Sequence, residues 1–393
     1  MSRRNLLALS LGAAGTALLP RLGLAATPAW DRTLVMIEFN GGNDGLNTVI
    51  PFDDPLYAQL RPKLAIPRDK AIQLNHEMGL HPALAPLMPL WKEREAAAVL
   101  GLGYPKPNHS HFRSIEIWET ASDADEFAEM GWVADALPES RLPKAGTPAV
   151  PAHVVLLGNG SPGPFEGGRL ALVSLDRQGQ APRHADNDMI EGLAPPKEPE
   201  RPEALEHIIS VRALDRQAAQ QILPARLAQV KMQSGFPQGS FGTAMESMAR
   251  LLLAGIMPPV IKLSLGSFDT HANQLGAHEK LLGEFAQALA ALRTVLTKAG
   301  LWDRVLVMTY SEFGRRAKEN ASQGTDHGTA APHFLLGGQV RGGLYGVQPP
   351  LSHLKDNDLV FTTDFRSYYN MIAEHWWRVP GVSGFKPLNG PLG

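Results

Sequence analysis

The sequence predicts an α/β fold in which helices cover both faces of a mostly parallel central sheet. Three observations support this prediction: short apolar runs, the polar or glycine-rich loops that end them, and the helical patterns that lie between them. Nearly continuous runs of Val, Ile and Leu are typical of strands that are buried on both faces. Strands that alternate with helices favour a parallel sheet.

Each expected strand is an apolar run that ends in a polar loop. The expected strands cover residues 33–39, 96–103, 154–157, 260–265 and 305–310. The clearest helix covers residues 277–298, where five apolar residues from Leu281 to Leu296 form one stripe and Gly300 ends the pattern. A second helical pattern covers residues 202–233.

The sequence predicts that residues 27–393 form a single domain. Residues 177–202 are rich in proline and charge, which predicts an exposed loop or cap insertion within that domain. With 44% hydrophobic and 19% charged residues and a formal net charge of −2, the chain is not typical of disordered or nucleic-acid-binding proteins. It has no cysteine, which excludes disulfides, thiolate metal sites and cysteine nucleophiles. Oxygen and imidazole groups must therefore carry any chemistry.

The first 26 residues have the pattern of a targeting signal. Arg3 and Arg4 precede a short run rich in Ala, Leu and Gly, and small residues near Ala26 offer a cleavage site. Paired arginines before a mildly apolar core resemble a Tat signal, which exports proteins that are already folded. We expect recognition by the Tat export machinery, removal of residues 1–26, and a periplasmic mature protein without a stable membrane span. The alternative is an N-terminal membrane anchor.

Acidic, amide and imidazole residues follow the expected strands. They are Asp44, Asn108, His109, Ser110, His111, Asp269, His271, Glu312, Asp326 and His327. In an open α/β sheet, ligands bind at the carboxyl ends of the strands, so we expect these residues to converge there. Each motif also has a simpler explanation as a turn residue, a helix cap or an acidic first turn.

Converging carboxylates and imidazoles repel one another unless a cation or a proton lies between them. The proposed ligands are Asp44, Asp269, His271, Glu312, Asp326 and His327. Oxygen and nitrogen donors of this kind suit one or two divalent ions, Zn²⁺, Mn²⁺ or Mg²⁺, whereas Ca²⁺ fits the imidazoles less well. Such ions polarise esters and activate nucleophiles.

The motifs, taken in order, resemble a known family. They are FNGGNDGLNTVIP, NHSHFRSIEIWET, SFDTHANQ, TYSEFGRRAKEN, TDHGTAAPHFLLGG and TTDFRSYYN. This series is similar to the bacterial exported family called domain of unknown function 1501, over essentially the whole mature chain. That family is similar in turn to the alkaline phosphatase and sulfatase superfamily, whose members hold two metals at the strand ends of a parallel sheet.

The resemblance implies roles for individual residues. Ser110 falls where the superfamily has its hydroxyl nucleophile, with Asn108 beside it. Asp44 resembles the metal ligand after the first strand, and Asp364 resembles the aspartate that opens the last helix. The other implied ligands are Asp269, His271, Glu312 and His327.

Two departures from the superfamily pattern stand out. Phe313 occupies the place of a ligand histidine, so one metal lacks a ligand unless His109, His111 or Asp326 replaces it, or the site holds a single metal. The formylglycine chemistry of sulfatases does not fit, because the sequence has no cysteine and Ser110 is followed by His, Phe and Arg.

These features predict an exported metal-dependent hydrolase of phosphate or related anionic esters. Ser110 would attack in line, and Arg113 or Arg315 would stabilise the transferring group. The alternative is a catalytically degenerate binding or assembly protein of the cell envelope that keeps the fold and one metal. The family resemblance also implies a partner from a second exported family, domain of unknown function 1800.

Overall fold

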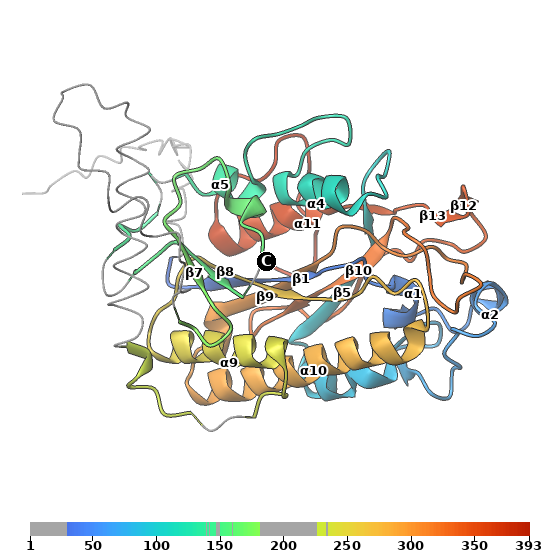
Figure 1. The fold of residues 1–393 in the computed structure, drawn as a ribbon, viewed down its shortest axis with the longest axis horizontal. Helices are drawn as coiled ribbons and strands as arrows, with labels where there is room; N and C mark the ends of the chain where they lie inside the picture. The colour runs from blue at the N-terminus through green and yellow to red at the C-terminus, as the bar shows by residue number, and fades with distance from the viewer. Residues whose placement is uncertain are drawn as a thin grey trace, which may run out of the picture.

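We describe a computed structural model of the chain (Figure 1). The described residues are 30–138, 140, 142–146, 150–158, 160–180, 226–232 and 235–393. The predicted signal segment 1–26, most of the predicted insertion and most of the helical pattern at 202–233 lie outside them. No helix within the described residues has the length and apolar character needed to cross a membrane.

A nine-stranded sheet forms the centre of the molecule, in the order β11-β5-β10-β9-β1-β8-β6-β7, with β14 paired to β5. Its strands are β1 (Thr33–Phe39), β5 (Ala96–Gly103), β6 (Val154–Leu157), β7 (Leu172–Leu175), β8 (Val260–Leu265), β9 (Val305–Tyr310), β10 (Ala331–Leu336), β11 (Gly343–Gly346) and β14 (Thr363–Asp364). β10 runs antiparallel to β5 and β9, and the other pairs are parallel. The predicted fold class is confirmed, and the five expected strands have the predicted bounds.

Helices cover both faces of this sheet (Figure 1). The helices are α1 (Gly45–Thr48), α2 (Pro55–Leu60), α3 (Met88–Lys92), α4 (His111–Thr120), α5 (Trp132–Ala136), α9 (Ser240–Leu253), α10 (Gln274–Lys298) and α11 (Phe365–Met371). Short helical segments are η1 (Pro82–Leu87), η3 (Gly163–Phe165), η6 (Trp302–Arg304) and η7 (Ile372–Trp377). α4, α5 and α11 lie on one face, and α9 and α10 lie on the other (Figure 1).

Small sheets complete the described fold. β2 (Val49–Ile50), β3 (Ile72–Gln73) and β4 (Gly79–Leu80) form one, and β12 (Leu354–Lys355) and β13 (Asp358–Leu359) form another. The predicted helix at 277–298 is α10, which begins three residues earlier at Gln274. The expectation that Asp364 opens the last helix is confirmed, because its carboxylate caps α11 by accepting a hydrogen bond from the Arg366 amide at 3.0 Å.

The two-sided burial of the sheet explains the nearly continuous apolar strands. Along β1, Leu34 and Met36 pack with α4, α5 and α11, whereas the alternate residues Val35 and Ile37 pack with α9 and α10. Successive side chains of a strand point to opposite faces, so a strand covered on both faces needs apolar residues at every position. The polar groups of these segments are therefore confined largely to the strand ends.

Candidate metal centre

Five loops meet at one edge of the large sheet. They are residues 40–44 after β1, 104–110 after β5, 266–273 after β8, 311–316 after β9 and 324–330 before β10. β1, β5, β8 and β9 point in the same direction, so their carboxyl ends share this edge. The loop before β10 also reaches it because β10 runs the opposite way. The reversed direction of β10 therefore places His327 beside the loops that follow the parallel strands.

His111, Asp269 and His327 lie close enough to hold one metal ion together. One potential ligand atom from each residue lies within 4.8 Å of the others. The distance from Asp269 to the His111 Nε2 is 3.5 Å, and that to the His327 Nε2 is 3.2 Å. His111 is the first residue of α4, Asp269 follows β8, and His327 precedes β10. Two imidazoles and a carboxylate suit a transition-metal ion.

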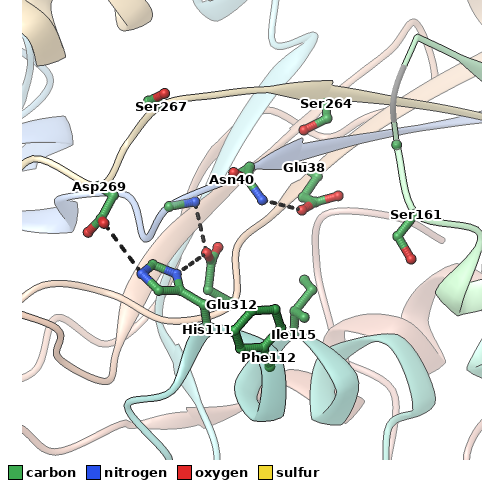
Figure 2. A pocket seen from close by; sticks show the side chains of 12 residues that line it. Glu38, Asn40, His111, Phe112, Ile115, Ser161, Ser264, Ser267, Asp269 and Glu312 are labelled. Atoms are coloured by element: carbon green, nitrogen blue, oxygen red, sulfur yellow. Dashed lines mark hydrogen bonds and ion pairs between the residues drawn. The ribbon is translucent and has the colours of Figure 1, made fainter.

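Glu312 orients His111 toward this group (Figure 2). Its buried Oε1 accepts hydrogen bonds from His111 Nδ1 and from the Gly41 amide, both at 2.8 Å. This contact raises the pKa of His111, chiefly through its hydrogen bond to Glu312. Because Nδ1 is occupied by Glu312, His111 presents Nε2 to Asp269, as outer-shell carboxylates do for metal-bound histidines.

His271 and Asp326 extend the group toward solvent. His271 Nε2 lies 3.0 Å from Asp269 Oδ1 and 3.0 Å from His327 Nε2, and its Nδ1 lies 3.2 Å from Asp326 Oδ1. A hydrogen bond from Asn320 is the largest cause that lowers the pKa of Asp326. We call His111, Asp269, His271, Glu312, Asp326 and His327, together with Arg315, the open cluster.

Arg315 sets the charge of the open cluster. Its buried guanidinium donates to Asp269 Oδ1 at 2.6 Å and to the Gly42 carbonyl at 2.9 Å. Burial raises the pKa of Asp269, but the hydrogen bond and charge of Arg315 outweigh it, and the pKa falls to about 2. With neutral histidines, the three carboxylates and one guanidinium leave two excess negative charges. One divalent cation would offset that excess, so the donor chemistry fits a single ion.

Asp44 belongs to a different set of contacts. Its carboxylate lies 2.6 Å from Arg61 Nη1, both side chains are fully buried, and Gln274 donates to the same oxygen. Burial alone raises the pKa of Asp44, but Arg61 outweighs this effect and lowers it. His278 Nε2 lies 3.0 Å from Asn43 Oδ1 beside this pair. Asp44, Arg61, Gln274, Asn43 and His278 form what we call the buried network.

The structure therefore separates Asp44 from the residues that the sequence grouped with it. The loop after β1 does reach the expected sheet edge, but the Asp44 side chain turns to Arg61 in the interior. A buried carboxylate needs a paired charge, and Arg61 supplies it. Within the described residues, the group that could hold a metal is His111, Asp269 and His327.

The three predicted catalytic residues occupy the start of α4. Ser110 is exposed, takes the N-cap position directly before His111, and donates its amide proton to Asn108 Oδ1 at 2.8 Å. Arg113 points to the chain that follows α4, where it donates to the Ala124 carbonyl at 3.1 Å and pairs with Glu116 at 2.9 Å. These contacts give Arg113 a structural role outside the open cluster.

A pocket of about 580 Å³ begins at the open cluster (Figure 2). Its lining residues are Glu38, Asn40, Gly41, His111, Phe112, Ile115, Gly160, Ser161, Ser264, Ser267, Asp269 and Glu312. His111, Asp269 and Glu312 lie at one end, and Glu38 and Ser264 lie away from them along the strand ends (Figure 2). Ligand sites of enzymes commonly have this concave form with few convergent polar groups.

The sequence missed or left open several of these residues. In the sequence, His111 was one of three alternatives for the missing ligand. In the structure, His111 Nδ1 lies 2.8 Å from Glu312 Oε1. Phe313, which stands where a ligand was expected, packs its ring 4.9 Å from that of His111 and 4.5 Å from that of His327. Lys262 was also missed, although a lysine inside the apolar run VIKLSL was a visible signal.

Comparisons with solved structures find similar chains at low identity. An alkaline phosphatase superfamily protein from Vibrio parahaemolyticus is 12% identical with a TM-score of 0.36, and the match covers 80% of this chain and 62% of that one. The lipoteichoic acid synthase from Listeria monocytogenes is 10% identical with a TM-score of 0.34, covering 83% and 68%. The alkaline phosphatase from the Antarctic bacterium TAB5 is 12% identical with a TM-score of 0.31, covering 81% and 95%.

The chain thus spans less than two thirds of the length of the Vibrio protein. No curated protein sequence matches the chain significantly. The family described as "Protein of unknown function (DUF1501)" matches residues 31–370, which include the whole open cluster. The chain therefore belongs to the DUF1501 family.

Proposed function

We propose that this protein is a metal-dependent hydrolase of phosphate or related anionic esters. One observation carries the proposal. Carboxylates and imidazoles from four chain segments, which begin at His111, Asp269, Glu312 and Asp326, converge at the mouth of a pocket. Three imidazoles, those of His111, His271 and His327, lie within 3.5 Å of the Asp269 carboxylate, and imidazole and carboxylate donors together suit a divalent metal ion.

The residues of the open cluster divide into ligands and orienting groups. His111 Nε2, the Asp269 carboxylate and His327 Nε2 would hold one Zn²⁺, Mn²⁺ or Mg²⁺ ion. Glu312 fixes His111 through Nδ1, and the His109 carbonyl fixes His327 through Nδ1 at 2.7 Å. Both imidazoles thus turn the remaining nitrogen to Asp269. A bound cation would supply positive charge that lowers the pKa of a nearby hydroxyl and stabilises the transferring group.

Ser110 is the proposed nucleophile. Its exposed hydroxyl precedes the ligand His111 directly and stands at the positive end of α4, which favours an anionic group. The Ser110 oxygen would form a bond to phosphorus as the bond from phosphorus to the leaving oxygen breaks. The serine proton passes to water, and the departing alkoxide takes up a proton. Water then cleaves the phosphoserine and restores the hydroxyl.

The charge of the transferring group also needs a cationic partner from the chain. Arg315 is the proposed residue, and it would act through Asp269, to which its buried guanidinium donates at 2.6 Å. Its other donors go to backbone carbonyls, and Arg113 is likewise held by Glu116 and by carbonyls after α4. Export by the Tat machinery, removal of residues 1–26 and a periplasmic location complete the proposal, because the pattern of the first 26 residues supports them. The proposal also includes a partner from the 1800 family, which the family resemblance implies.

Metal analysis and an ester panel test the proposed function. Purified residues 27–393 should contain one Zn, Mn or Mg per chain, and Asp269→Asn should reduce this content at least tenfold. The protein should hydrolyse at least one phosphate mono- or diester, phosphonate or sulfate ester.

Ser110→Ala should lower turnover at least a hundredfold while metal content stays unchanged. Ser322→Ala, a change of another exposed serine, serves as the matched control. Full turnover by Ser110→Ala would exclude Ser110 as the nucleophile. Bound metal without turnover on any ester would favour the alternative, a binding or assembly protein of the cell envelope.

A further inference from the structure

We infer that the pocket beside the open cluster binds a neutral polyhydroxylated group, such as a sugar or glycerol unit, which is the leaving group of the ester. This inference rests on the proposed function, because the ester's anionic end would lie at the open cluster. It adds the chemical class of the substrate, which neither the fold nor the family description supplies.

One wall of the pocket is made of hydrogen-bonding side chains without apolar bulk. Glu38 and Ser264 are partners in the β1–β8 register, so both stand at the same strand-end position. Asn40 donates to Glu38 Oε1 at 3.0 Å, and Ser161 and Ser267 complete the wall (Figure 2). Hydroxyls and an amide both accept and donate hydrogen bonds, and a carboxylate accepts them. A ligand with several hydroxyl groups matches this wall.

The opposite wall is apolar and comes from α4 (Figure 2). Phe112 is 88% exposed although it lines the pocket, and Ile115 follows three residues later on the helix. Residues three or four apart share a helix face, so Ile115 lies beside both Phe112 and the cluster residue His111. A sugar ring presents C–H groups on its face and hydroxyls at its rim. It would therefore cover the aromatic ring while its hydroxyls reach the polar wall.

Lys262 fixes the two walls relative to each other. Its buried Nζ lies 2.7 Å from the Ser161 carbonyl, 2.9 Å from Glu119 Oε1 and 3.3 Å from Glu38 Oε2. These three contacts join the loop after β6, helix α4 and strand β1. A wall held in this way is preorganised, which reduces the entropy that binding costs.

The contacts of Lys262 also determine which ligand charge this end of the pocket favours. Both carboxylate oxygens of Glu38 are engaged, Oε1 by Asn40 and Oε2 by Lys262, so Glu38 does not offer a free carboxylate for an amine. An acidic group is disfavoured as well, because Glu38 and Glu119 share one lysine. The remaining match is a neutral group that hydrogen bonds to Glu38 and Asn40.

Binding measurements by calorimetry test this inference. The probes are glucose 6-phosphate, glycerol 3-phosphate and inorganic phosphate, each with the metal-loaded protein. We expect at least one of the two esters to bind tenfold or more tightly than phosphate. Phe112→Ala and Asn40→Ala should each remove most of that difference. Phe127→Ala, which changes an aromatic residue that is 76% exposed outside the pocket, should leave it unchanged.

Equal affinity for phosphate and both esters would overturn the inference, as would a preference that survives both pocket substitutions. These outcomes are separable from failure of the proposed function. Hydrolysis of aryl phosphate without a preference for hydroxylated esters would contradict the inference about the pocket and leave the proposed hydrolase function standing. Preferential binding without hydrolysis of any ester would support the pocket and reject the catalytic proposal. Exposed Phe112 is unlike a core residue, so its variant should fold.

Discussion

The open cluster and the buried network contain the same residue types, but the first is a candidate metal site and the second is a buried structural ion pair. In each, an arginine donates to an aspartate at 2.6 Å, and a histidine lies nearby. The side chains of Asp44 and Arg61 are fully buried, whereas the Asp269 side chain is 41% exposed. Asp44 is thus closed off by protein, and Asp269 still faces a pocket that admits a ligand.

The comparison shows that burial, not residue identity, separates a structural carboxylate from a candidate ligand. Asp44 lies in the interior, where its interaction with Arg61 offsets the cost of removing two charges from water. Asp269 pairs with Arg315 through Oδ1, while Oδ2 faces His111 and the pocket. Asp44 Oδ1 is buried without a hydrogen-bond partner, whereas Asp269 Oδ2 lies 3.5 Å from His111 Nε2. Three predictions test this difference, in order of expected size.

Replacing Arg61 should have the largest effect. Arg61→Met leaves Asp44 charged, buried and unpaired, and we expect a loss of about 3–5 kcal/mol in the free energy of unfolding, measured by urea denaturation. Asp269→Asn should lower the same quantity by less than Arg61→Met does, because Asp269 is partly exposed and the buried Arg315 keeps its hydrogen bonds to the Gly42 and Thr325 carbonyls. Similar losses from both variants would contradict the distinction between the two regions.

Metal binding should stabilise the protein through the open cluster alone. At one hundred times its dissociation constant, Mn²⁺ or Zn²⁺ should raise the free energy of unfolding by about 2.7 kcal/mol. Asp44→Asn should keep this response although its own stability is lower, and His327→Gln should lose it. Thermal unfolding with and without EDTA measures the response. A response that disappears in Asp44→Asn would return Asp44 to the ligand set that the sequence predicted.

Acid should destabilise the buried network through His278. Burial lowers the pKa of His278 from 6.5 to about 3. Since the folded pKa is below the unfolded one, this contribution to stability is complete above pH 6.5 and is lost as the pH falls toward 3. We expect a slope of about 1.4 kcal/mol per pH unit from this histidine within that window.

His278→Gln should reduce that slope by about 1.4 kcal/mol per pH unit, which corresponds to one proton, measured by urea denaturation from pH 7 to pH 4. The pKa of His333 is likewise lowered to about 3 by burial, but His333 lies outside the buried network, beside Trp118. His333→Phe should therefore reduce the slope by a similar amount without affecting Asp44. An unchanged slope in both variants would show that neither histidine is buried in its neutral form.

The sequence predicted much of the fold because its signals are local. The run at 33–39 and the stripe of 277–298 identified β1 and α10 without any knowledge of their neighbours. Contacts between residues far apart in the sequence could not be predicted in this way. Glu312 meets His111 across 201 residues of chain, and no pattern in either motif specifies that contact.

The sequence by itself determined the types of element, the absence of thiol chemistry and the placement of polar loops after strands. These follow from the periodicity of burial and from composition. Only the tertiary structure decided which polar residues meet. The reversed direction of β10 brought His327 to the sheet edge, and Arg61 drew Asp44 into the interior. Strand direction and the pairing of buried charges depend on distant parts of the chain, which local sequence patterns do not record.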